Sequence, residues 1–283
     1  MATSNMASSI REFEYTHADF DVLRKISRQY SGILVPDDKF DMFYSRLAKR
    51  IRLLGLSSFK EYCQYLTDHP DTEFTEFINA VTTNLTAFFR ENHHFEYLSS
   101  TVVPELLRKK AGVKQVKIWS AGCSTGEEPY SLAITLKERL PADWDIKILA
   151  TDLDTNVLAT AASGVYSEER VTGIAEQRLK RWFQKGSGRQ ANKVRVRAEL
   201  RQLIAFRQLN LMQEWPMRGG FDAIFCRNVL IYFDRETKAM LAERYAGLLD
   251  TGGCLFIGHS ESLHQLDTAF DPIGNTIYRK ARK

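Results

Sequence analysis

The stretch of sequence that decides the fold reads Trp119-Ser120-Ala121-Gly122-Cys123-Ser124-Thr125-Gly126-Glu127-Glu128. It completes the apolar, alternating run 116–119, contains two glycines four residues apart, and leads into a helical pattern that opens with two acids. A strand, a tight turn and a helix N-terminus are the parts with which open α/β sheets bind a small charged ligand. The stretch therefore predicts a ligand-binding turn at the carboxyl end of a parallel strand.

The two acids of this turn indicate the kind of ligand. Free N–H groups at a helix N-terminus suit a carboxylate, whereas Glu127 and Glu128 repel phosphate and attract an ammonium or sulfonium group. S-Adenosylmethionine (SAM) carries both of these cations and a carboxylate. A nicotinamide site is disfavoured because Gly-x-Gly-x-x-Gly is absent. On this stretch alone, the acids can equally well serve only to complement the helix dipole.

The composition is that of a soluble globular protein. The 283 residues are 44% hydrophobic and 26% charged, enough for one large domain or two modest ones. A net charge of +4 does not require nucleic acid as a partner, although it can serve an acidic one. The four cysteines are far apart, so we expect buried, reduced thiols. The adjacent His93 and His94 face different directions on a helix, so we expect no metal site. We find no signal peptide and no apolar run near 20 residues, and expect a cytoplasmic protein.

Residues 1–83 read as a small all-α domain. The first 12 or so residues are rich in Ser, Ala and Asn and are expected to fray. Four apolar stripes at helical spacing follow, without any strand pattern. Their boundaries are marked by Thr16 with Asp19, by Asp37 and Asp38 as caps of the second helix, by Gly55 at its end, and by Ser58 with Glu61.

Residues 84–283 read as an α/β domain with a doubly wound, mostly parallel, Rossmann-like sheet. We predict strands at residues 116–119, 146–150, 203–209, 221–226 and 254–258, with helices between them such as 127–140 and 237–249. The tail, residues 270–280, is expected to add one antiparallel strand. Turn residues at 185–189 and alternation at 194–197 predict a β-hairpin insert at about 183–202.

Polar side chains gather where the predicted strands end. Asp152 follows the second strand, where an acid commonly binds ribose hydroxyls, while Asp154 can cap the next helix. The polar segment 84–90 precedes the sheet; a capped helix with core aromatics would explain Phe88 and Phe89, but not Arg90 as readily. Tyr232 follows the fourth strand, where core packing is the more common role of a tyrosine. The sequence Gly258-His259-Ser260-Glu261-Ser262 lacks a nucleophile elbow, so we discount a serine nucleophile.

Four cations gather on the second predicted helix. Arg46, Lys49 and Arg50 recur at i, i+3 and i+4, and Arg52 lies beside them. A solvated face is the default interpretation of such a stripe. Few acids offset it, however, so a docking surface for an acidic partner is an alternative.

Taken together, these residues give the chain a resemblance to the chemotaxis receptor methyltransferases (CheR family), which are SAM-dependent protein-glutamate O-methyltransferases. The resemblance covers nearly the whole chain. Its most specific motifs are Thr83-Asn84-Leu85-Thr86-Ala87-Phe88-Phe89-Arg90, Ser124-Thr125-Gly126-Glu127-Glu128-Pro129-Tyr130-Ser131, Phe225-Cys226-Arg227-Asn228 with Ile231-Tyr232-Phe233, and Gly258-His259-Ser260-Glu261. Four such motifs in the family's order are hard to attribute to coincidence.

The resemblance implies roles for individual residues. SAM, with S-adenosylhomocysteine as its product, would be bound by Asn84, Thr86, Arg90, Glu128, Asp152, Asn210, Leu211, Arg227 and Asn228. Arg90 and Tyr232 would lie beside the transferring methyl group, and of the two acids Glu128 rather than Glu127 would reach the ligand. No metal is implied, and we expect a monomer.

The resemblance also implies two contacts with a receptor. The helix carrying Arg46, Lys49, Arg50 and Arg52 would dock on the acidic helical bundle of the receptor's cytoplasmic domain. The hairpin insert would bind a receptor C-terminal peptide by strand addition. Gly186, Gly188 and Arg195 match the family's peptide-binding members, whereas Lys185 and Asn192 depart from them.

The expected chemistry requires no general base. A glutamate has a pKa of about 4.3 and is already a nucleophilic carboxylate at neutral pH. A nucleic-acid N-methyltransferase is the first alternative, because Asn228-x-x-x-Tyr232 is similar to an Asn-Pro-Pro-Tyr site; the missing prolines and the low net charge argue against it. A non-catalytic SAM-sensing or receptor-binding module is the second, and the sequence leaves it open.

Overall fold

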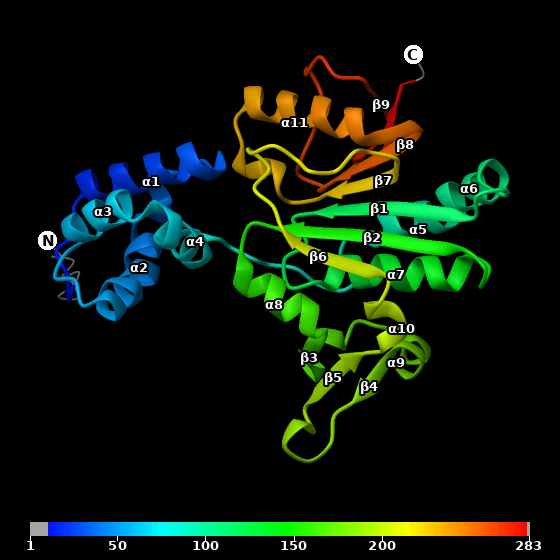
Figure 1. The fold of residues 1–283 in the computed structure, drawn as a ribbon, viewed down its shortest axis with the longest axis horizontal. Helices are drawn as coiled ribbons and strands as arrows, with labels where there is room; N and C mark the ends of the chain where they lie inside the picture. The colour runs from blue at the N-terminus through cyan, green and yellow to red at the C-terminus, as the bar shows by residue number, and fades with distance from the viewer. Residues whose placement is uncertain (1–10, 282–283) are drawn as a thin grey trace, which may run out of the picture. The chain divides into compact units, whose positions relative to one another are not determined.

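A computed structural model describes residues 11–281, and the chain divides between Thr82 and Thr83 into two compact units (Figure 1). The expectations for the first ten residues, fraying and the lack of a signal peptide, lie outside the described residues. Among residues 11–281, no helix is long and apolar enough to cross a bilayer.

The first unit consists of helices, as predicted. They are α1 (His17–Ser31), the 3-10 turn η1 (Asp37–Lys39), α2 (Phe40–Leu54), α3 (Phe59–Asp68) and α4 (Pro70–Val81). Thr16 and Asp19 form the predicted capping box, and Gly55, at φ 69°, ends α2. The apolar stripes meet in one core that includes Phe20, Leu23, Phe43, Leu47, Ile51, Phe59, Tyr62, Leu66 and Phe77.

The prediction that Asp37 and Asp38 cap α2 is wrong. Both residues belong to η1, and no side chain caps α2 at Lys39. The reason is that η1 runs directly into α2, so the N–H of Phe40 is already bonded to the carbonyl of Asp37. The Asp37 carboxylate instead accepts a hydrogen bond from Arg24.

The second unit contains the predicted doubly wound sheet. Its seven strands lie in the order β6-β2-β1-β7-β8-β10-β9. They are β1 (Gln115–Ala121), β2 (Asp145–Asp152), β6 (Ile204–Gln208), β7 (Phe221–Cys226), β8 (Leu249–Ile257), β9 (Phe270–Gly274) and β10 (Ile277–Lys280). The first five in spatial order pair in parallel, and β10 and β9 are antiparallel. Strand order reverses between β1 and β7, the place where such sheets open a crevice at their carboxyl edge.

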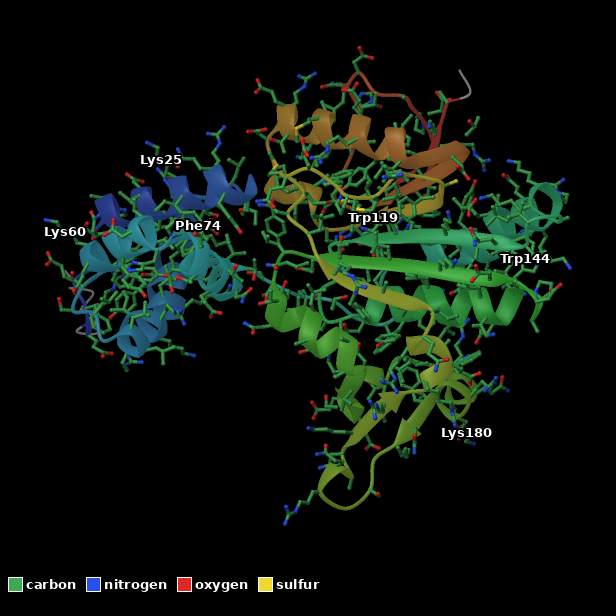
Figure 2. All side chains as sticks on the ribbon, in the orientation of Figure 1. Lys25, Lys60, Phe74, Trp119, Trp144 and Lys180 are labelled. Carbon is green, nitrogen blue, oxygen red and sulfur yellow. The ribbon has the colours of Figure 1, made fainter. Side chains whose placement is uncertain are left out.

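Helices cover both faces of this sheet. The helical elements that flank it are α5 (His93–Tyr97), η2 (Leu98–Val102), α6 (Val103–Lys109), α7 (Glu127–Arg139), α8 (Thr155–Ser163) and α11 (Arg235–Leu248). Trp119, labelled in Figure 2, is fully buried and packs edge-on against Tyr245 of α11. Its neighbour Ile118 belongs to the core cluster that contains Tyr130 of α7. Because successive strand residues point to opposite faces, the contact of Trp119 and the cluster that contains Ile118 place α11 and α7 on opposite sides of β1.

The tail differs from the single strand that we expected. It folds into a hairpin of β9 and β10, in which Ile277 pairs with Gly274. The two residues between the strands, Asn275 and Thr276, have φ of 49° and 59°. Positive φ at both central residues is what a tight two-residue hairpin turn requires, and the sequence analysis did not recognise this turn.

A second, three-stranded sheet carries the predicted hairpin insert. It contains β3 (Val165–Ser167), β4 (Phe183–Lys185) and β5 (Lys193–Val196) in the antiparallel order β3-β5-β4. Its other elements are η3 (Glu168–Val171), α9 (Glu176–Trp182), η4 (Gly188–Gln190) and α10 (Ala198–Arg201). We call residues 165–201 the β subdomain; it lies at the bottom of Figure 1. The predicted bounds, 183–202, miss β3, which is too short to show a period-two pattern.

Candidate active site

The turn after β1 has the geometry that its two glycines require. Gly122 and Gly126 have φ of 94° and 98°. A Cβ at Gly122 would lie 2.4 Å from a methyl of Val229, and one at Gly126 would lie 2.8 Å from Cβ of Ala161. Gly126 precedes α7 and no side chain caps the helix there. The turn therefore delivers an uncapped helix N-terminus to the carboxyl edge of the sheet.

The two acids of the turn have different partners. The fully buried Glu127 accepts hydrogen bonds from Arg170 of the β subdomain, through Nε at 3.0 Å, and from the hydroxyl of Thr125 at 2.6 Å. Glu128 accepts from the hydroxyl of Ser120 at 2.7 Å and from Nη1 of Arg227 at 3.0 Å. Burial raises the pKa of Glu128 above its usual range. Glu128 thus forms an ion pair with Arg227, and the spacing of the sequence did not reveal this partner.

The acid after β2 is held by main-chain N–H groups. Asp152 accepts from the N–H of Ser124 at 2.7 Å and from that of Asp154 at 3.0 Å. Burial nevertheless raises the pKa of Asp152 to about 6. Asp154 caps α8, as predicted, by accepting from the N–H groups of Asn156 and Val157.

The segment that precedes α5 crosses the same edge of the sheet. Residues 82–90 form no helix, which excludes the capped helix considered above. Asn84 donates to Asp154 at 2.8 Å, and its carbonyl accepts from the hydroxyl of Ser124 at 3.2 Å. Further along, Nη1 of Arg90 donates to the carbonyl of Leu85 at 2.7 Å, which curls the segment over itself. We call residues 84–91 the roof segment.

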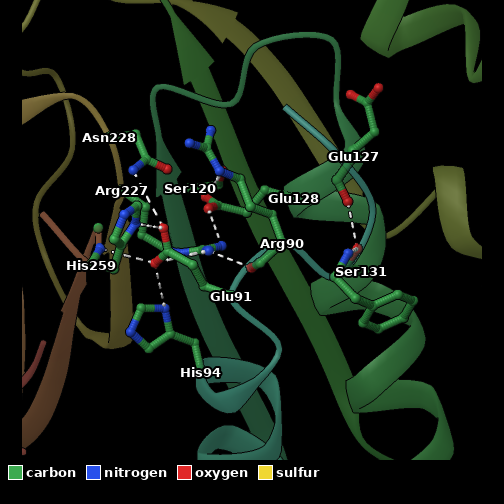
Figure 3. Close-up of polar contacts among 12 residues, drawn as sticks. Arg90, Glu91, His94, Ser120, Glu127, Glu128, Ser131, Arg227, Asn228 and His259 are labelled. Atoms are coloured by element: carbon green, nitrogen blue, oxygen red, sulfur yellow. Dashed lines mark hydrogen bonds and ion pairs between the residues drawn. The ribbon is translucent and has the colours of Figure 1, made fainter. Parts of the chain in front are cut away.

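Arg227 joins the roof segment to the sheet (Figure 3). Its side chain is 2% exposed and lies 3.0 Å from Glu128 and 3.3 Å from Glu91, while its Nη2 also donates to the carbonyl of Arg90. Glu91 in turn accepts from the imidazole of His259 at 2.9 Å. Although burial opposes ionisation, the hydrogen bonds from His259 and the charge of Arg227 lower the pKa of Glu91 to about 2. A cation thus lies between two carboxylates, away from water.

Glu261 fixes the turn that follows β7 and was missed as a functional residue. Its carboxylate accepts from the N–H groups of Asn228 and Ile231, both at 3.0 Å, and from that of Gly258. Tyr232 lies in this turn, in the 3-10 helix η5 (Leu230–Tyr232), and is half-buried. An acid shortly after a buried strand end was the available signal. Residues 258–262 were interpreted only as a possible serine nucleophile and as a motif of the family resemblance.

Backbone strain is concentrated around these contacts. Phe89, Glu91, Ser124 and Asn228 have φ of 53°, 54°, 48° and 59°. Such values are uncommon for residues other than glycine, and functional sites are where they cluster.

The other predicted SAM-binding residues lie at the same edge or near it. Asn210 and Leu211 follow β6, and the N–H of the preceding Leu209 donates to the carbonyl of Asp152 at 2.9 Å. Asn210 is buried and accepts from the N–H of Met212. Thr86 is half-buried in the roof segment. Asp154 thus links Asn84 to Asp152, whose carbonyl accepts from Leu209. A second set of contacts, through Arg227 and Glu91, links Arg90, Glu128 and Asn228.

Most of the predicted docking cations on α2 already have partners, so the premise that few acids offset them is wrong. Arg50 forms two hydrogen bonds, at 2.8 and 2.6 Å, with the buried Glu73 of α4. Arg52 pairs with Glu12, and Arg46 donates to the carbonyls at the end of α4. The acids come from other parts of the chain, which the helical spacing of α2 could not show. Lys49 is exposed.

The predicted peptide-binding residues lie in the β subdomain. A Cβ at Gly186 would lie 2.0 Å from the carbonyl oxygen of Gln190, and Gly188 has φ of 56°, so both glycines serve the loop between β4 and β5. Arg195 is exposed on β5. Because β5 is the central strand, only β3 and β4 offer a free edge to a further strand.

No group of three metal-ligating side chains occurs in the part of the chain that the structure describes. His94 is buried and contacts the carbonyl of Asn275 and the hydroxyl of Thr276 through Nε2. Burial, together with the nearby Arg227, lowers its pKa to about 3, so it is neutral near pH 7.

A doubly wound sheet with a glycine turn after β1, an acid after β2 and an uncapped helix N-terminus is a Rossmann-like ligand site, of the kind that both dinucleotide-binding enzymes and SAM-dependent methyltransferases use, and the family match assigns this one to the SAM-dependent methyltransferases. The CheR methyltransferase SAM binding domain matches residues 84–279, and the CheR methyltransferase all-alpha domain matches residues 18–82. The chain belongs to the CheR family, whose known role is the methylation of glutamates in chemotaxis receptors.

Three relatives are similar over nearly their whole length. The chain is 46% identical to chemotaxis protein methyltransferase 2 of Pseudomonas aeruginosa, over 96% of both chains. It is 45% identical to a probable chemotaxis protein methyltransferase of Rhizobium etli, over 89% of this chain and 96% of that one. It is 42% identical to the chemotaxis protein methyltransferase of Escherichia coli, over 98% of this chain and 95% of that one.

Proposed function

We propose that the edge of the sheet between β1 and β7 binds SAM and presents its methyl group to a receptor glutamate, with Arg90 and Tyr232 at the reacting end. The single observation that supports this assignment is the position of Arg227. It contacts Glu128 of α7 and the carbonyl of Arg90, and so joins three of the four family motifs at one edge of the sheet.

The side chains present fit SAM. The uncapped N-terminus of α7 suits the carboxylate of its methionine part, and Glu128 suits the ammonium group. Asp152 would accept from the ribose hydroxyls. Asn84, Thr86, Asn210, Leu211 and Asn228 would complete the site. When bound, SAM supplies an electrophilic methyl group on a positively charged sulfur.

The task left to the protein is alignment and desolvation. The acceptor carboxylate is ionised at neutral pH, and its charge diminishes as the ester forms, so water around it opposes the reaction. Arg90 would orient the carboxylate without holding it too firmly, because ground-state binding alone does not raise turnover. The hydrogen bond from Arg90 to the carbonyl of Leu85 supports this role, since it restricts the guanidinium. Tyr232 would fix the acceptor or the methyl group through its hydroxyl.

Two substitutions test these roles. We expect Arg90→Ala and Tyr232→Phe to lower turnover by about 10²-fold, a common effect of losing one positioned polar group, while S-adenosylhomocysteine affinity changes less. Matched controls are Arg139→Ala, at the exposed end of α7, and Tyr97→Phe on α5. Unchanged turnover in both site variants would remove these assignments.

The product of labelled SAM distinguishes the competing functions. We expect the label in base-labile carboxyl esters of the receptor. Label in DNA or RNA would favour a nucleic-acid methyltransferase. Binding of SAM without transfer to any acceptor would favour a sensing module.

We further propose that α2 docks on the acidic helical bundle of a receptor's cytoplasmic domain. Lys49, Arg52 and the 74% exposed Leu53 form the accessible part of this surface, and Arg46 and Arg50 extend it. The cations would steer the encounter with an acidic bundle, and the leucine would add apolar contact. We also propose that the protein acts in the cytoplasm and as a monomer.

We also propose that the β subdomain binds a receptor C-terminal peptide as an added strand. Gly186, Gly188 and Arg195 and the free edges of β3 and β4 support this proposal. Calorimetry with receptor C-terminal peptides tests it, with Arg195→Ala as the variant. Heat of binding that is the same in Arg195→Ala would argue against a role of this arginine.

A further inference from the structure

The β subdomain contacts the turn that precedes α7 through two side chains. The hydroxyl of Tyr166, on β3, donates to the carbonyl of Thr125 at 2.7 Å. Arg170, in η3, donates through Nη2 to the hydroxyl of Thr125 at 3.1 Å and through Nε to the carboxylate of Glu127 at 3.0 Å. These bonds hold the residues on both sides of Gly126.

The turn is closely fitted to these contacts. Tyr166 is 4% exposed and Glu127 is fully buried, so neither group can exchange its partner for water without a rearrangement. A Cβ at Gly126 would lie 2.9 Å from the Tyr166 hydroxyl. The glycine is therefore required by the subdomain as well as by the backbone conformation of the turn.

The same subdomain supports the roof segment. Phe88 packs edge-on against Tyr166 and Phe183, with ring centroids 5.1 and 5.4 Å apart. The guanidinium of Arg178 lies 4.5 Å from the ring centroid of Phe89. Tyr166 thus contacts both the turn after β1 and the roof segment.

We infer that Tyr166 and Arg170 are positioning residues for SAM. This inference rests on the proposal that SAM binds at this turn. The N–H groups of α7 can meet the ligand carboxylate only if residues 125–127 keep one orientation, and groups fixed in advance bind more tightly than groups that must be ordered on binding. Arg170 also neutralises Glu127, whose buried charge would otherwise lie at the same helix end. The β subdomain is then a part of the SAM site as well as a surface for a peptide.

The sharpest test is Tyr166→Phe in the full chain, because it removes one hydroxyl and leaves the aromatic packing in place. We expect the Kd of S-adenosylhomocysteine, measured by calorimetry, and the KM for SAM to rise about 5- to 10-fold, the range of one lost hydrogen bond. Turnover at saturating SAM should stay within about twofold, since the reacting groups are unchanged. The matched control is Tyr62→Phe, which removes a buried hydroxyl that donates to the carboxylate of Glu73 at 2.9 Å within the helical unit.

Arg170 provides the second test. We expect Arg170→Ala to weaken S-adenosylhomocysteine binding about tenfold or more, and Arg170→Lys, which keeps the charge opposite Glu127, to restore part of the affinity. Arg181→Ala is the control, because its ion pair with Glu199 lies in the same subdomain without contacting the turn.

The outcomes separate this inference from the proposed function. If Tyr166→Phe and Arg170→Ala lower the unfolding midpoint but leave the Kd of S-adenosylhomocysteine equal to that of the controls, the two residues only attach the subdomain and the inference is wrong. If the wild-type chain does not bind S-adenosylhomocysteine, or if Asp152→Asn and Glu128→Gln bind it unchanged, the proposed site itself is wrong.

Discussion

The ion pairs of Arg227 and those on α2 use the same residue types, arginine and glutamate, in opposite ways. Arg227 is 2% exposed, and its partners Glu128 and Glu91 are 9% and 10% exposed. On α2, Arg52 and its partner Glu12 are 56% and 51% exposed. In the first region the charges are shielded from solvent, so each charge depends on the others; in the second, water screens the pair and leaves both ions available to a partner protein.

The difference indicates which charged side chains are available to bind a ligand. A buried carboxylate such as Glu128 needs a cation in the unliganded protein, so the role that we propose for it at the ligand would be shared with Arg227. An exposed cation such as Lys49 has no comparable need. Arg50 lies between these extremes, because it is 19% exposed and holds the 2% exposed Glu73.

The largest effect should come from Arg227→Ala. It leaves Glu128 and Glu91 buried without their cation, which costs about 3–5 kcal/mol of unfolding free energy. Urea unfolding followed by tryptophan fluorescence checks this, since all four tryptophans lie between residues 119 and 215, in the sheet unit. Arg181→Ala, which breaks an exposed pair, is the control. A loss below about 1 kcal/mol would mean that the network is as weak as a surface ion pair.

Arg50→Ala should have the next largest effect. It leaves Glu73 buried with only the hydroxyl of Tyr62 at 2.9 Å, and a buried charge short of one partner costs about 2 kcal/mol. Because the helical unit has no tryptophan, its unfolding is followed by far-UV circular dichroism. A shift in the fluorescence transition instead would contradict the assignment of this pair to the helical unit alone.

Asp152 should make SAM binding depend on pH. Its pKa is raised to about 6, so the carboxylate that would accept from ribose hydroxyls is lost as the pH falls through 6. At pH 5 roughly one tenth of it remains ionised, so S-adenosylhomocysteine should bind about tenfold more weakly than at pH 7. Calorimetry across this range measures the change. Asp152→Asn should bind weakly at every pH, and a slope that survives in this variant would assign the titration to another group.

The smallest effect on stability should come from the exposed cations of α2. Arg52→Ala should not move the unfolding midpoint, because its pair with Glu12 is exposed. Lys49→Glu should leave turnover unchanged but raise the KM for a receptor fragment several-fold, about 3 to 10, with a weaker dependence on salt. Lys60→Glu, the same charge reversal on α3, is the control. An equal KM in the two reversals would remove α2 from the docking surface.

The elements of the fold were largely predictable, because strands and helices produce local patterns of apolar and polar residues in the sequence. The runs at 116–119 and 221–226 and the glycines at 122 and 126 mark β1, β7 and the turn. The hairpin turn at Asn275 and Thr276 and the three-residue β3 were missed, since each is too short to show a period.

The partners of the site residues were much less predictable. Glu128 and Arg227 are 99 residues apart, and Asn84 lies 70 residues from Asp154. Sequence order says which side chains reach the carboxyl edge of the sheet, but it does not say which of them neutralise one another there. The role of Glu261 is of the same kind, because it depends on three main-chain N–H groups from two loops.

The left-handed backbone at Phe89, Glu91, Ser124 and Asn228 has a consequence for anyone who wishes to engineer this enzyme. Glycine at these positions would relieve strain, yet it would also give the loops more freedom in the unfolded and unliganded chain. Efforts to raise heat resistance are therefore better directed at the surface of the helices. In the loops that we propose bind the methyl donor, a gain in thermal stability is therefore expected to lower activity, and substitution by glycine would not avoid this loss.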